Sequence, residues 1–60
     1  MQNELINEVL RVCGNNNDKV CEFANDLGLR NHSGNWWQAA FDIATKCGSV
    51  AEIHRLAYAD

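Results

Sequence analysis

The sequence predicts an all-α fold, a compact bundle of four short helices arranged as two αα-hairpins. Three observations lead to this prediction. Apolar residues recur every three or four positions, as they do on the buried face of a helix. No segment alternates between apolar and polar residues, which is the pattern of a half-buried strand. Glycines follow three of the apolar stretches, at places where a helix commonly ends.

The four helices are expected at about residues 3–13, 18–27, 35–47 and 50–58. Gly14, Gly28 and Gly48 follow the first three, because Gly takes the left-handed backbone conformation that ends a helix at no steric cost. Leu29 is expected to fold back onto the second helix as the apolar residue that accompanies such an end. The third helix has the widest apolar arc, so we expect it to be central and to contact the other three.

Residues that cap helix starts mark the beginnings of the last three helices. Asn17 or Asp18 is expected to cap the second, and Asn35, with Gln38 three residues later, the third. Ser49–Glu52 is a complete capping box for the fourth. The residues that the fourth helix is expected to turn inward are Val50, Ile53, Leu56 and Ala57.

Length and composition indicate one domain over residues 1–60, with 47% apolar and 22% charged residues, as in folded proteins. No apolar run is long enough to span a membrane, and the first residues lack the pattern of a secretory signal. We therefore expect a cytoplasmic protein without membrane attachment.

The sequence offers little support for catalysis or for a bound cofactor. Cys13, Cys21 and Cys47 are odd in number, which favours buried apolar thiols over disulfides. Their spacing to one another, to His32 and to His54 does not match the paired ligands of a zinc site. No catalytic triad or phosphate-binding loop can be assembled, so we expect neither an enzyme nor a metal. For His54 we expect a partly buried ring bonded to the backbone.

Nucleic-acid binding is not expected from the charge, because the net charge is −3 and the five basic residues are spread singly along the chain. A degenerate helix-turn-helix regulator remains the alternative function. Its short pattern, Ala followed four residues later by Gly, occurs at Ala24 to Gly28 and at Ala44 to Gly48. The candidate recognition helix that follows each pattern is not basic, since one contains Asp42 and the other Glu52.

The leading hypothesis is a protein-interaction module that uses Trp36, Trp37, Arg30 and His32. Trp and Arg are the residues most enriched at interaction hot spots. Successive helical residues point about 100° apart, so the two Trp rings cannot share one pocket. One ring is therefore expected at the surface, although both could instead fill the core. A third hypothesis is a homodimer that buries surplus apolar surface of the first and third helices.

The run Ser33 to Phe41, together with the size and helical character of all 60 residues, resembles the small accessory early-region proteins of lambdoid temperate phages. This resemblance implies a non-enzymatic protein that acts inside an infected bacterium by binding a host or phage protein. It implies no particular functional residue.

Overall fold

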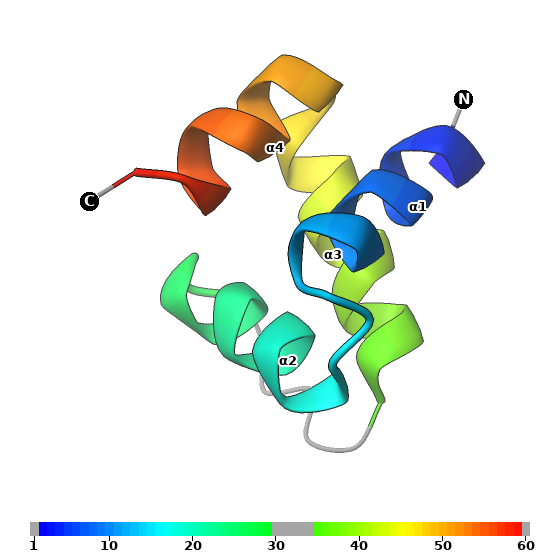
Figure 1. Ribbon diagram of the computed structural model, residues 1–60, viewed down its shortest axis with the longest axis vertical. Helices are drawn as coiled ribbons and strands as arrows, with labels where there is room; N and C mark the ends of the chain where they lie inside the picture. Colours follow the sequence, from blue (N-terminus) through cyan, green and yellow to red (C-terminus); the bar gives the residue numbers. More distant parts are fainter. Residues whose placement is uncertain (1, 30–34, 60) are drawn as a thin grey trace.

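The computed structural model describes residues 2–29 and 35–59, and these ranges are helical apart from short turns (Figure 1). The helices are α1 (Gln2–Val12), α2 (Asn17–Asp26), α3 (Trp36–Cys47) and α4 (Val50–Ala57). The predicted all-α bundle is confirmed, and every helix end lies within one residue of its expected position. None of the helices in the described ranges combines the length and the apolar character needed to cross a membrane.

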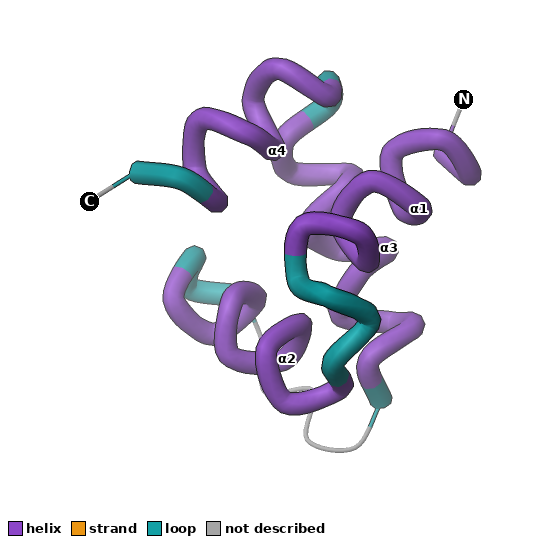
Figure 2. Tube along the Cα trace, viewed as in Figure 1, coloured by secondary structure: helices purple, strands orange, loops and turns teal. Residues whose placement is uncertain are grey.

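The central helix is α3, as predicted, because it packs against α1, α2 and α4. α1 also packs against α4, whereas α2 contacts α1 and α4 only slightly. Figure 2 shows α4 at the top of the view and α2 at the lower left. α3 lies behind α1 in the same view. α1 and α2, which were expected to pair as the first αα-hairpin, therefore have little contact with each other and meet mainly through α3.

The core consists of aliphatic and small side chains from all four helices. Ala39, Ala40 and Ala44 let the neighbouring helices approach α3 closely, and the largest fully buried side chains are isoleucines and valines. Neither Trp is fully buried, in keeping with the size of its ring. The buried apolar residues are Ile6, Val9, Cys13, Val20, Cys21, Ala24, Ala39, Ala40, Ile43, Ala44 and Ile53.

The turn between α1 and α2 corrects the predicted start of the second helix. Gly14 and Asn15 both adopt left-handed backbone conformations, with φ of 66° and 53°. Two successive residues of this kind reverse the chain quickly, so that Asn16 already serves as the N-cap. Its side chain accepts a hydrogen bond from a backbone N–H in the first turn of α2 (3.1 Å). The predicted caps, Asn17 and Asp18, lie inside that first turn instead.

Two other predicted helix ends are confirmed. After α2, Gly28 has a φ of 79°, and the N–H of Leu29 donates to the carbonyl of Ala24 (3.1 Å). These are features of a Schellman motif, and Leu29 packs partly buried against the core. At the start of α4, the hydroxyl of Ser49 accepts a hydrogen bond from the N–H of Glu52 (3.2 Å), whereas the Glu52 carboxylate accepts from Arg55, so only one half of the predicted capping box forms.

Some side chains that were predicted to point inward are only half-buried. Of the inward residues predicted for α4, Ile53 is fully buried, but Val50, Leu56 and Ala57 are half-buried. Phe23, from the apolar face of α2, is half-buried as well. The cause lies in the arrangement of the helices. Because α2 and α4 both pack on α3 and hardly on each other, the side chains that face the space between them are incompletely covered.

Shortening a buried side chain of α3 tests its central position. Ile43→Ala is expected to lower the free energy of unfolding by about 2–5 kcal/mol, because it removes packing and leaves a cavity. That loss is comparable with the whole stability of a domain this small, which is roughly 3–9 kcal/mol at 0.05–0.15 kcal/mol per residue. Urea unfolding followed by circular dichroism measures the change. The exposed Lys46→Ala is the control, and equal midpoints for both variants would contradict the central role of α3.

Candidate functional site

The two adjacent tryptophans at the start of α3 lie in different environments. Trp36 is half-buried and packs against the core, whereas Trp37 is 53% exposed. Because successive helical residues point about 100° apart, the two rings diverge. The sequence left open which ring reaches the surface, and the structure places Trp37 there.

A second exposed ring, that of Phe41, lies one helical turn beyond Trp37 and is 40% exposed. Residues four apart are neighbours on a helix surface, so Trp37 and Phe41 form one patch, which we call the aromatic face. Ala44, a further turn along this side of α3, is fully buried, which confines the aromatic face to the first two turns. The predicted binding residues did not include Phe41. Its spacing of four from Trp37 is the signal that could have identified it.

Hydrogen bonds fix the polar side chains that flank the aromatic face. Asn35 is the N-cap of α3 and accepts a hydrogen bond from the N–H of Gln38 (3.3 Å), so the helix begins at Trp36. The side-chain amide of Gln38 in turn donates to the carboxylate of Asp42 (3.1 Å). These bonds therefore hold the polar side chains beside the two rings in a defined arrangement.

The two other predicted binding residues, Arg30 and His32, lie outside the described residues. The structure thus assigns positions to Trp36 and Trp37 alone among the four.

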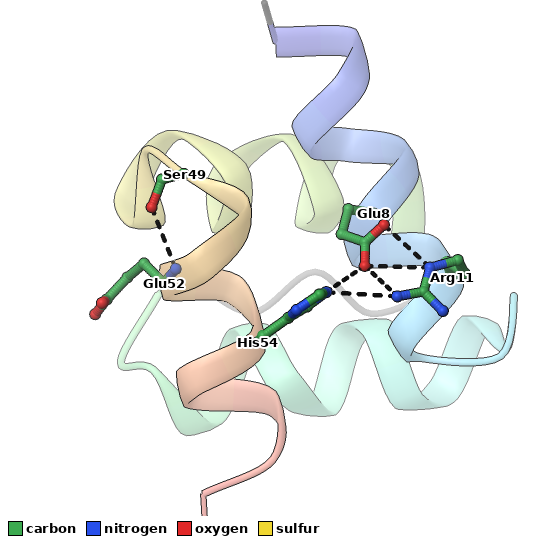
Figure 3. A network of polar contacts seen from close by, with 5 residues as sticks. All are labelled: Glu8, Arg11, Ser49, Glu52 and His54. Atoms are coloured by element: carbon green, nitrogen blue, oxygen red, sulfur yellow. Dashed lines mark hydrogen bonds and ion pairs between the residues drawn. The ribbon is translucent and has the colours of Figure 1, made fainter.

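A second group of side chains, the polar cluster of Glu8, Arg11 and His54, joins α1 to α4 (Figure 3). Nε of Arg11 donates to the Glu8 carboxylate (3.0 Å), and Nε2 of His54 contacts the same carboxylate. Since an ionised carboxylate only accepts, Nε2 of His54 carries the proton of this bond. The expected backbone partner of His54 is therefore wrong. Packing of α4 against α1 brings the ring to a side chain 46 residues away in sequence.

Glu8 is the most enclosed member of the polar cluster, with a side chain 17% exposed against 39% for His54 and 62% for Arg11. Hydrogen bonds from Arg11 and then from His54 lower the pKa of Glu8 from 4.5 to about 2, although burial opposes this shift. The same carboxylate raises the pKa of Arg11. Glu8 is consequently ionised at neutral pH, and its charge supports the contact between α1 and α4.

No disulfide links the three cysteines; Cys13 and Cys21 are buried, as predicted, whereas Cys47, which was also expected to be buried, is half-buried. Burial raises the pKa of the Cys13 and Cys47 thiols, which keeps them protonated and poorly nucleophilic at neutral pH. Sγ of Cys21 donates to the side-chain oxygen of Asn17 (3.6 Å). Within residues 2–29 and 35–59, no three His, Cys, Asp or Glu side chains are grouped so that they could hold a metal ion.

Basic side chains on the described surface are partly engaged by carboxylates. Arg11 binds Glu8, and Nε of Arg55 donates to the carboxylate of Glu52 (2.9 Å). Glu52 and Arg55 lie on α4, which is the second helix of one helix-turn-helix alternative. A recognition helix directs its cations to phosphates and bases. The pairing of Arg55 with its neighbour does not favour that alternative.

The lowered pKa of Glu8 predicts a specific dependence of stability on pH. A carboxyl group with a lower pKa in the folded protein contributes stability that is fully present above its ordinary pKa of 4.5 and is lost as the pH falls towards 2. The urea midpoint of Glu8→Gln should therefore fall less than that of the original protein when the pH is lowered from 4.5 towards 2. Glu4→Gln, which removes an exposed carboxylate of α1 outside the polar cluster, is the control. If the urea midpoint of Glu8→Gln fell more steeply with decreasing pH than that of Glu4→Gln, the role of the polar cluster would be contradicted.

Comparisons of the chain with protein-family models, with curated proteins and with solved structures give no match. Inferences about function therefore depend on the surfaces of the molecule itself.

Proposed function

We propose that this chain is a small, non-enzymatic protein-interaction module that binds a partner protein through the aromatic face of α3. The observation that carries the proposal is the exposure of Trp37 and Phe41, 53% and 40%, on adjacent turns of one helix. Single exposed apolar residues are common on protein surfaces, but adjacent large rings form a patch of the kind that marks an interaction site.

The chemistry of the aromatic face suits protein binding. Aromatic rings bury a large area while few rotatable bonds are fixed, so the entropic cost of binding is low. The flanking side chains of Gln38 and Asp42 are already bonded to each other, which leaves less to be ordered when a partner binds. Such polar neighbours can also exclude water from the edge of the contact.

The resemblance to accessory proteins of lambdoid phages suggests the kind of partner, a bacterial host protein or a phage protein in the host cytoplasm. Arg30 and His32 precede the aromatic face in the chain and are included in the proposed binding surface. A second copy of the chain is the alternative partner.

The double variant Trp37→Ala/Phe41→Ala tests the proposal, with Tyr58→Ala as the matched control because Tyr58 is an exposed ring on a different helix end. Affinity capture from a bacterial lysate, with and without nuclease, should yield a protein that the control retains and the double variant loses. Affinity for that protein should fall by about 2 kcal/mol or more, or roughly 30-fold, as for a hot spot.

Folding of each variant is checked by urea unfolding, and capture is compared under conditions in which both variants are folded, because Trp37 and Phe41 are only 53% and 40% exposed and their removal also costs packing. Capture that is equal for the double variant and the control would contradict the proposal. Capture that requires nucleic acid would instead favour the helix-turn-helix alternative. Sedimentation of the purified chain identifies a homodimer, which the double variant should dissociate if the aromatic face forms its interface.

A further inference from the structure

A groove of about 310 Å³ opens between α2 and α4, at the end of α1. Its volume is near the lower end of the range for ligand-binding pockets, about 300–1,000 Å³, so it suits a few side chains of a partner. The residues that line it come from α1, α2 and α4 and the chain that follows them. The groove is therefore separate from the aromatic face, which belongs to α3.

Part of the groove is lined by apolar side chains, which we call its floor, and the fold leaves them accessible. Val12, Phe23 and Leu56 line it, and each is only half-buried. They belong to the apolar stripes of α1, α2 and α4, but α2 and α4 hardly contact each other and leave them without a cover. An apolar side chain placed here would gain the free energy of leaving water.

The wall that α2 contributes is acidic. Glu22 and Asp26 line the groove four residues apart, on neighbouring turns of one helix face. Both are exposed, and neither forms an ion pair within the described residues. Lys19 also lies on this rim, so the charged side chains of the lining sum to −1, from two carboxylates and one ammonium group.

The backbone adds further negative potential to the groove. α1 ends at Val12, α2 at Asp26 and α4 at Ala57, and all three residues are in the lining. Each helix end carries roughly −0.5 elementary charge from its aligned peptide dipoles. Asp26 stands at the negative end of α2, whose last turn contains no basic residue, whereas the last turns of α1 and α4 contain Arg11 and Arg55. The end of α2 is therefore the most negative of the three. Figure 1 shows the green end of α2 and the red end of α4 directed towards the same place.

We propose that the groove between α2 and α4 is a second docking site, which binds a basic amphipathic segment of a partner protein. A Lys or Arg side chain of that segment places its apolar stem on the floor and its cation between the acidic wall and the helix ends. An adjacent apolar side chain covers Phe23 and Leu56. The two features of the groove, an apolar floor and a negative rim, thus fit one kind of occupant. This inference does not depend on the aromatic face.

The test uses a synthetic helical peptide of Leu and Arg, and a peptide of the same length built of Leu and Glu. Each is titrated into the isotope-labelled protein, and binding is followed by the shifts of its amide signals. The Leu/Arg peptide should shift amides at the ends of α1, α2 and α4, and the Leu/Glu peptide should shift none of these. Shifts centred on the aromatic face, or spread evenly over the acidic surface, would overturn the proposal.

Neutral variants separate the groove from the general charge of the protein. Glu22→Gln/Asp26→Asn should weaken binding of the Leu/Arg peptide about three- to tenfold, the effect of losing two partly exposed ion pairs. Glu4→Gln/Asp18→Asn removes the same charge from exposed positions outside the groove and should leave the affinity unchanged. Equal weakening by both double variants would overturn the proposal.

A variant that fills the groove tests the apolar floor. Ala57→Phe places a ring at the end of α4 without changing charge or removing a core side chain, so the protein should remain folded. It should abolish the amide shifts that the Leu/Arg peptide causes at the groove. Unchanged binding by a folded Ala57→Phe would show that the peptide does not occupy the groove and would overturn the proposal.

Discussion

Close packing on α3 is the constraint on which the rest of the structure depends. Ala39, Ala40 and Ala44 are fully buried, and their small side chains allow three helices to contact one. A chain of 60 residues cannot surround every helix in this way. α3 takes the central place, so α2 and α4 each bury one side against it and have little contact with each other. The open surfaces of the molecule follow from this arrangement.

The local signals of the sequence were sufficient to locate the helices. Gly28 with Leu29, and Ser49 with Glu52, specify helix ends through hydrogen bonds between near neighbours in the chain, which is why these positions were predicted correctly. The cap at Asn16 was missed because the sequence does not reveal that two successive residues before it take left-handed conformations.

Features that depend on contacts between distant segments could not be predicted in the same way. The helical repeat required Trp36 and Trp37 to diverge, but the packing of α3 decides which ring is covered. No local pattern connects Glu8 with His54, because only the docking of α4 on α1 brings them together. The half-burial of Leu56 similarly reflects the placement of whole helices, which the apolar stripe of α4 does not encode.

The attachment of α4 has a consequence for the motions of the molecule. This helix has eight residues and one fully buried side chain, Ile53, supplemented at its flank by the bond from His54 to Glu8. Elements held by so few buried contacts open locally at a lower free energy than the whole protein unfolds. Cys13 lies in the groove that α4 borders, with 7% of its surface exposed. Opening of α4 would therefore expose Cys13, and the rate at which a thiol reagent modifies Cys13, measured separately from that of the more exposed Cys47, would follow this local motion.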